Sequence, residues 1–310
     1  MFDIAELADG VRRVTFPMPT KPWHVHGYLL AGDDGWLLVD TGLALPDLEH
    51  DAGSLGVPVA RIVVTHFHPD HVGGADQLRA ATGAPVLQGE LDYAQCLHVW
   101  GNPGWPERMA AWFAEHGVPR EITDDLIEVG SAYAAFIRFA RDPEPLRAGD
   151  LVDGWEVVAL PGHADGHIGL HRDGALVSGD HLLPRISPAV GLYPDSRPDP
   201  LGDYLDSLRR TEELAPRVVY PGHGDPIGDP SARARELVEH HRLRLDETEA
   251  ALGPEPRSAY EASLSVFGAD LSPAARRFAV AETLSHLVRL AEEGRAERVT
   301  DERGATWRAG

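Results

Sequence analysis

The chain of 310 residues is long enough for one large domain or two modest ones. Its 28 Lys and Arg against 49 Asp and Glu give a formal net charge of −21, which disfavours nucleic acid and anionic membranes as partners. Cys96 is the single cysteine, so an intrachain disulfide is excluded. No apolar run approaches the ~18 residues of a membrane helix, and no signal-peptide pattern opens the chain, so we expect a cytoplasmic protein.

The first 90 residues predict short strands that alternate with turns and short helices. Strands are expected at 11–16, 26–30, 36–40, 60–65 and 85–88, and helices at 48–55 and 75–82. An alternation of β-rich and βα units is typical of a layered α/β protein.

Residues 91–125 differ, because aromatic and apolar side chains recur there at roughly helical spacing around Gly101-Asn102-Pro103-Gly104. Two interpretations stay open for this helical insertion. It forms two helices that pack their apolar faces onto the core, or it forms a helical cap over a pocket. The candidates for lining such a pocket are Trp105, Arg185 and Tyr193.

Strands resume at 155–160, 169–171, 175–178 and 218–220, with an amphipathic helix at 200–214. Beyond residue 230 the pattern changes to three helices, at 232–252, 259–267 and 274–293. Strands at 296–299 and 306–308 then flank a turn at 301–304. Three helices followed by a β-hairpin is a winged-helix arrangement. We therefore predict a catalytic domain over 1–229 and a small C-terminal winged-helix domain over 230–310.

The residues that point to chemistry begin directly after the predicted strand 60–65, in the run His66-Phe67-His68-Pro69-Asp70-His71. A strand end followed by a loop turns several of these side chains to one side. Imidazole suits zinc and iron, and a carboxylate can bridge two ions. The run holds more donor groups than one ion needs, which favours two metals.

Three more residues repeat one local pattern, each after a predicted strand and directly behind a glycine: His163, Asp180 and His223. The glycine lets the backbone turn sharply and approach its neighbours closely. A single histidine in such a place would more often be structural. The complete set predicts a metal centre, with ligands His66, His68, Asp70, His71, His163, Asp180 and His223.

These motifs together resemble the metallo-β-lactamase-fold hydrolases, over roughly residues 10–228. Within that superfamily, Gly162-His163-Ala164-Asp165-Gly166-His167 followed by Gly179-Asp180 is similar to the glyoxalase II-like branch. The tail from about 230 resembles the winged-helix domain that one branch carries. The resemblance implies an α/β fold, an αββα sandwich with its metals at one edge of the two sheets.

The resemblance also implies roles for the candidate ligands. One ion would be held by His66, His68 and His163, the other by Asp70, His71 and His223, with Asp180 bridging them. The two divalent ions are expected to be Zn²⁺, although this ligand set also accepts Fe or Mn. A hydroxide that bridges the ions would attack a carbonyl carbon while a metal stabilises the oxyanion. Asp70 and Asp180 are the catalytic candidates, with Asp70 steering a proton to the leaving group.

Two positions separate this chain from other branches of the superfamily. His68 stands where the iron-binding redox branch has Glu, which disfavours a diiron redox role. Asp180 stands where secreted antibiotic-destroying branches place a Cys ligand, which argues against a true β-lactamase.

Asp40 and His167 are predicted to orient the ligands from behind. Turn capping by Asp40 and an ordinary surface position for His167 remain open alternatives. Ser178 is interpreted as a turn residue rather than a nucleophile. His181 is not expected to bind metal, because neighbouring side chains of a strand point apart.

The leading hypothesis is hydrolysis of a small thioester, ester or lactone, so the expected partner is a small carbonyl substrate. The first alternative is a metal-dependent phosphodiesterase or ribonuclease, which the winged-helix tail favours and the charge of −21 disfavours. The second is a non-catalytic binding protein on the same fold, which would predict a broken ligand set. The C-terminal domain also makes a homodimer possible.

Overall fold

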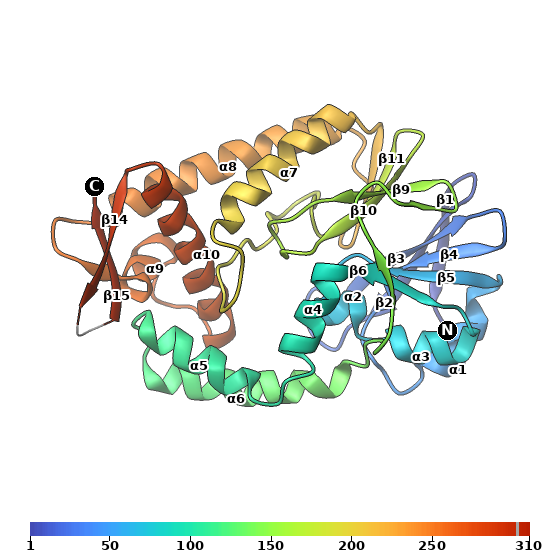
Figure 1. Ribbon diagram of the computed structural model, residues 1–310, viewed down its shortest axis with the longest axis horizontal. Coiled ribbons are helices and arrows are strands. Elements are labelled where there is room, and N and C mark those ends of the chain that lie inside the picture. The colour runs from blue at the N-terminus through green and yellow to red at the C-terminus, as the bar shows by residue number, and fades with distance from the viewer. Residues whose placement is uncertain (302–303) are drawn as a thin grey trace.

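The chain folds into two packed β-sheets with helices on both outer faces, followed by a smaller C-terminal part (Figure 1). The structure is a computed structural model and describes residues 1–301 and 304–310. The first sheet has the order β1-β2-β3-β4-β5-β6-β7, with strands Asp3–Ala8, Val11–Pro17, His24–Ala31, Trp36–Val39, Val59–Val64, Val86–Gly89 and Glu144–Leu146. The second has the order β12-β11-β10-β9-β8, with strands Val218–Pro221, Ala175–Gly179, Ile168–Arg172, Trp155–Ala159 and Leu151–Val152.

Alternation along the strands explains the layers. In β4, Leu37 and Val39 are buried between the two sheets, whereas Leu38 packs on the outer face of the first sheet. In β11, Val177 lies between the sheets and Leu176 faces outward. Successive side chains of a strand point to opposite faces, so strands that are apolar throughout must be covered on both sides. The predicted αββα sandwich is confirmed.

Helices supply the two covers. The outer face of the first sheet packs against α1 (Leu48–Asp51) and α3 (Ala75–Thr82). A 3₁₀ turn, η1 (Ala52–Leu55), follows α1, so the predicted helix at 48–55 is present with a tighter last turn. The outer face of the second sheet packs against α7 (Pro200–Leu214) and α8 (Pro230–Ala250), which lie side by side (Figure 1). Proline opens both helices behind an aspartate cap.

The segment between β6 and β7, two neighbouring strands of the first sheet, contains three helices where the sequence predicted two. They are α4 (Glu90–Val99), α5 (Trp105–Glu115) and α6 (Arg120–Tyr133), ended by η2 (Ala134–Phe136). The insertion therefore continues to Phe136, beyond the predicted end at 125. α5 and α6 lie along the lower edge of the molecule and reach the C-terminal helices (Figure 1).

The C-terminal part consists of α8, α9 (Ala259–Phe267) and α10 (Pro273–Glu292) with a three-stranded sheet of order β13-β15-β14. Its strands are Arg257–Ser258, Gly304–Ala309 and Ala296–Asp301. The predicted turn at 301–304 includes Glu302 and Arg303, which lie outside the described residues. Within the described residues, no helix combines the length and hydropathy needed to cross a membrane.

Candidate metal centre

The first candidate ligands follow β5. The strand ends at Val64, and a short loop leads to α2 (Pro69–Val72), whose first residue is a proline. Proline suits this position because the first N–H of a helix has no intrahelical partner. His66 and His68 lie on the loop, and Asp70 and His71 lie on the first turn of α2.

The other three candidates follow β9, β11 and β12, at the same edge of the sandwich. The glycines that precede them allow close packing, as the sequence predicted. A methyl group on Gly162 would collide with the backbone of Tyr204 on α7, and the residue has a positive φ of 133°. A methyl group on Gly222 would lie 2.7 Å from Cε1 of His71 and closer still to Oδ1 of Asp180.

The seven candidates converge into three overlapping clusters, in each of which the ligand atoms lie within 4.8 Å of one another. The clusters are His66–His68–His163, His66–His71–Asp180 and Asp70–His71–His223. In the first, Nδ1 of His68 faces Nε2 of His163 at 2.9 Å. In the third, Oδ2 of Asp70 lies 3.2 Å from Nε2 of His223.

Asp180 lies between the first and third clusters. Its Oδ1 is 3.4 Å from Nε2 of His71, and its Oδ2 is 3.5 Å from Nε2 of His223 and 3.7 Å from Nε2 of His163. One carboxylate therefore faces ligand atoms of both outer clusters. This is the position that a carboxylate bridging two cations requires.

A pair of cations fits the residues that are present. Among the described residues, three buried atoms of the middle cluster have no hydrogen-bond partner: Nε2 of His66, Nε2 of His71 and Oδ1 of Asp180. A buried polar atom without a partner costs about 1–3 kcal/mol. Coordination of a divalent cation satisfies all three atoms, and a donor set of imidazole and carboxylate suits a transition metal.

Three of the imidazoles are held in their neutral form. Burial lowers the pKa of His66 well below its usual value, and the nearby His71 lowers it further. Burial also lowers the pKa of His68 to about 3 and, although Asp180 opposes the effect, lowers that of His163. Neutral imidazole is the form that binds a metal, so the first cluster needs no deprotonation at neutral pH.

The third cluster is different because carboxylates surround its imidazoles. Burial alone would lower the pKa of His223, but Asp180 and Asp70 outweigh it and raise the pKa to about 10. The pKa of His71 is likewise raised well above its usual value, since Asp180, Asp40 and Asp70 together outweigh burial.

Proton release should therefore accompany metal binding. His71 and His223 are protonated in the metal-free protein at pH 7 and must be neutral as ligands, so we expect at least two protons to leave when both sites fill. Apparent affinity should then rise with pH until it levels off near the His223 pKa of about 10. Calorimetric titration of zinc in buffers of different ionisation enthalpy measures the proton count, and a heat independent of the buffer contradicts the expectation.

Asp40 and His167 contact the ligands from behind. Oδ2 of Asp40 accepts a hydrogen bond from Nδ1 of His71 at 2.8 Å, and Oδ1 accepts one from the backbone N–H of Thr65 at 2.8 Å. His167 is buried rather than a surface residue, and its ring stacks on that of His66 at 4.6 Å. Its Nε2 accepts a hydrogen bond from the backbone N–H of Asp180 at 3.2 Å.

Sequence reasoning missed Asp92 on α4. This fully buried carboxylate accepts a hydrogen bond from the backbone N–H of Phe67, between two ligand candidates, at 2.8 Å. Its second oxygen accepts from Nε2 of Gln88 at 2.5 Å. Burial raises the pKa of the Asp92 carboxyl well above its usual value. An acidic residue in the first turn of a helix carries no signal that distinguishes it from a surface residue.

Two backbone carbonyls also orient imidazoles, and the sequence alone could not predict these contacts. Nδ1 of His163 donates to the carbonyl of Ala189 at 2.8 Å, and Nδ1 of His223 donates to that of His24 at 3.1 Å. In each case the hydrogen bond fixes the tautomer, so Nε2 is the atom that faces the cluster.

The remaining residues that the sequence singled out lie elsewhere. His181 is buried and hydrogen-bonded to Thr211, so it does not join the clusters. The hydroxyl of Ser178 contacts backbone carbonyls. Tyr193 packs near the rings of Trp112 and Phe113, and Trp105 packs on His98. Arg185 is exposed.

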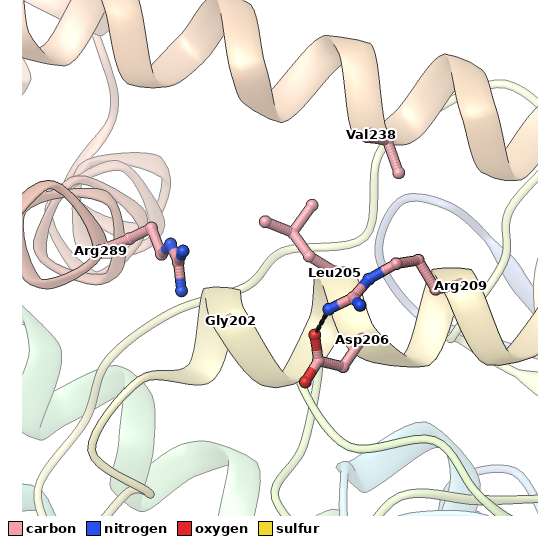
Figure 2. Close-up of a pocket in the computed structure, with 6 residues that line it drawn as sticks. All are labelled: Gly202, Leu205, Asp206, Arg209, Val238 and Arg289. Carbon is pink, nitrogen blue, oxygen red and sulfur yellow. Dashed lines mark hydrogen bonds and ion pairs between the residues drawn. The ribbon is translucent and has the colours of Figure 1, made fainter. Parts of the chain in front are cut away.

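A separate hollow of about 200 Å³ lies on the outer side of α7, between that helix, α8 and α10 (Figure 2). Its arginines are already paired, Arg209 with Asp206 and Arg289 with Asp199. None of the seven candidate ligands lines it.

This fold and this convergence of histidines and aspartates define a class of protein. The chain belongs to the metallo-beta-lactamase superfamily, whose pattern matches residues 20–223. Residues 245–308 match a second family, described as the metallo-beta-lactamase-like C-terminal domain. Members of the fold bind divalent metals, and the clusters of this chain provide the ligand types for them.

Particular relatives agree with that assignment. A metallo-beta-lactamase family protein from Thermus thermophilus is 36% identical, with a TM-score of 0.84 over 98% of this chain and 100% of that one. The probable metallo-hydrolase YqjP of Bacillus subtilis is 29% identical over 84% of this chain and 86% of its own length. A hydroxyacylglutathione hydrolase of Methylobacillus flagellatus is 28% identical over 73% of this chain and 70% of its own.

Proposed function

We propose that this chain is a dinuclear metal-dependent hydrolase that cleaves a small thioester, ester or lactone. The observation that carries the proposal is the position of Asp180, whose carboxylate faces ligand atoms of two separate clusters. Two ions, rather than one, account for seven converging donors.

Two divalent ions supply a hydroxide near neutral pH and stabilise negative charge that develops on a carbonyl oxygen. The residues of the chain arrange the surroundings. The Asp40 carboxylate and the Ala189 carbonyl fix the orientation of His71 and His163. The Asp70 carboxylate, 3.2 Å from Nε2 of His223, is the group placed to carry a proton toward the leaving group.

Two observations favour a carbonyl substrate over a phosphodiester. A net charge of −21 repels a phosphate backbone. One relative is named a hydroxyacylglutathione hydrolase, which describes the cleavage of an acyl group from glutathione. The glyoxalase II-like motif around His163 agrees with that relationship. We propose Zn²⁺ as the resident metal.

An assay panel on protein loaded with Zn²⁺, Fe²⁺ or Mn²⁺ tests the proposal. The panel contains S-lactoylglutathione, a short acyl-coenzyme A, a p-nitrophenyl ester, a γ-lactone, bis(p-nitrophenyl) phosphate and a single-stranded RNA. We expect turnover of at least one carbonyl compound, lost on treatment with a chelator and restored by metal. Cleavage of the phosphodiesters alone would make the chain a nuclease-type hydrolase, and no turnover of any compound would favour a binding protein.

The remaining proposals concern the C-terminal part and the setting of the protein. We propose that α8, α9 and α10 with the β14–β15 hairpin form a winged-helix-like domain that walls the site rather than binding nucleic acid. The cytoplasmic location and a homodimer stay predictions from the sequence. Light scattering of the purified chain tests the homodimer.

A further inference from the structure

The connection between β11 and α7, residues 180–199, has no helix or strand of its own. It contains Pro184, Pro188, Pro194 and Pro198. Its position must therefore come from contacts with other elements. One of its carbonyls, that of Ala189, accepts the hydrogen bond from Nδ1 of His163. Whatever holds residue 189 also orients this candidate ligand.

The C-terminal helix α10 holds the connection at residues 190–192. Oγ of Ser285 donates to the carbonyl of Val190 at 2.5 Å, with the carbonyl of Glu282 in its own helix as a longer acceptor at 2.9 Å. The backbone N–H of Leu192 donates to the carbonyl of Ala281 at 3.0 Å. Ser285 and Val190 are both fully buried. A buried hydrogen bond is costly to lose, because the carbonyl left behind cannot turn to water.

Helix α8 holds the earlier half of the same connection. Nε of Arg233 donates to the carbonyl of Leu183 at 2.8 Å, and another guanidinium nitrogen donates to that of Ile186 at 2.9 Å. The Arg233 side chain is only 16% exposed. On the far side of the connection, Asp195 pairs with His98 and Arg108, but these partners are about half exposed and bind weakly.

We propose that Ser285 is a positioning residue for His163, and that α8 and α10 complete the metal centre by holding the carbonyl of Ala189 in place. The route has two steps, from the Ser285 hydroxyl to the Val190 carbonyl, and from the adjoining peptide to the His163 imidazole. The inference rests on the proposed role of His163 as a ligand. The C-terminal helices would then contribute to metal binding, although none of the candidate ligands lies on them.

The geometry makes the effect selective for one ion. His163 belongs to the cluster with His66 and His68 and takes no part in the cluster of Asp70, His71 and His223. A shift of the Ala189 carbonyl therefore disturbs the first cluster directly. The third cluster keeps its own orienting contacts, from Asp40 to His71 and from the His24 carbonyl to His223.

The test compares Ser285→Ala with Thr283→Val in the full-length chain. Thr283 is buried two residues away on α10, and its hydroxyl donates to Ala279 within the helix, so its loss leaves the connection untouched. Competition with a chromogenic chelator measures the zinc affinity of each site. We expect Ser285→Ala to weaken one site roughly 10-fold, because orienting partners of metal ligands typically contribute 10–100-fold. The other site should stay within about twofold, as should both sites of Thr283→Val.

Two further readouts separate positioning from general destabilisation. Hydrogen exchange of residues 183–195 in the metal-free protein should speed up in Ser285→Ala and not in Thr283→Val. Ser285→Thr, which keeps the hydroxyl, should restore the affinity. Equal weakening of both sites, unchanged exchange of the connection, or no rescue by threonine overturns the proposal. None of these measurements uses a substrate, so an inactive assay panel leaves the result intact.

Arg233→Gln provides a second route if Ser285→Ala folds poorly. It removes the donors to Leu183 and Ile186, and Arg235→Gln on the exposed side of α8 is its matched control. We expect the same one-site loss of zinc affinity from Arg233→Gln alone. Loss from both arginine variants overturns the proposed path.

Discussion

Replacing Asp180 with asparagine should lower kcat/KM by roughly 10²–10³-fold, equivalent to about 3–4 kcal/mol of transition-state stabilisation. Asparagine has nearly the same shape but no charge, and it offers one oxygen where the carboxylate offers two. Asp180 faces His71, His163 and His223 at once, so it is shared between the first and third clusters. The substitution therefore leaves one of these two outer clusters without its shared ligand. Metal analysis should find about one ion per chain instead of two.

The matched control is Asp173→Asn. Asp173 lies in the β10–β11 turn with a positive φ of 49°, which asparagine tolerates, and its side chain is 91% exposed. Activity and metal content should both stay at the level of the parent protein. Retention of two ions and near-full activity by Asp180→Asn would remove the bridging role.

Gly222→Ala should distort the metal centre without altering any donor atom. The added methyl group would lie 2.7 Å from Cε1 of His71 and would crowd Oδ1 of Asp180. His71 cannot retreat easily, because its Nδ1 is held by Asp40 at 2.8 Å. Displacement of a catalytic group by about 1 Å can cost ~10²-fold in rate, and overpacking costs about 1–3 kcal/mol of stability. We expect both effects, measured as kcat/KM and as the free energy of unfolding.

Gly228→Ala isolates the steric cause of that effect. Gly228 follows the same strand six residues later, and a methyl group there meets nothing within 4 Å. Neither glycine has a positive φ, so backbone strain contributes to neither substitution. Gly228→Ala should bind two ions and unfold like the parent. Equal damage from the two substitutions would mean that the crowding at residue 222 is not the cause.

Much of the sandwich could be predicted because its strands are apolar on both faces and short turns separate them. The run 60–65 and the helix at 200–214 correspond closely to β5 and α7. Strands β1, β7 and β8 were missed. β7 and β8 have only three and two residues, too short for a periodic pattern, and both lie at sheet edges where packing rather than composition selects the strand.

The candidate site was predictable for a different reason. Its ligand residues are of few chemical types, they follow strands, and a glycine precedes three of them, so local sequence carries the information. The orienting groups were less visible. Asp92 looks like an ordinary helical residue. The group at residue 189 is a backbone carbonyl, which every residue type carries, so the sequence gives no signal of its role. Only tertiary structure brings these groups to His163 and to the loop after β5.

The metal ligands are spread widely along the chain, and this spread determines how early in synthesis the metal centre can form. The first lies at position 66 and the last at position 223, and the helix that steadies residue 190 ends at Glu292. A nascent polypeptide that has not yet released residue 223 from the ribosome therefore presents only part of the ligand set. Loading with a full complement of metal therefore becomes a late event in biogenesis, after His223 and the helix α10 have emerged.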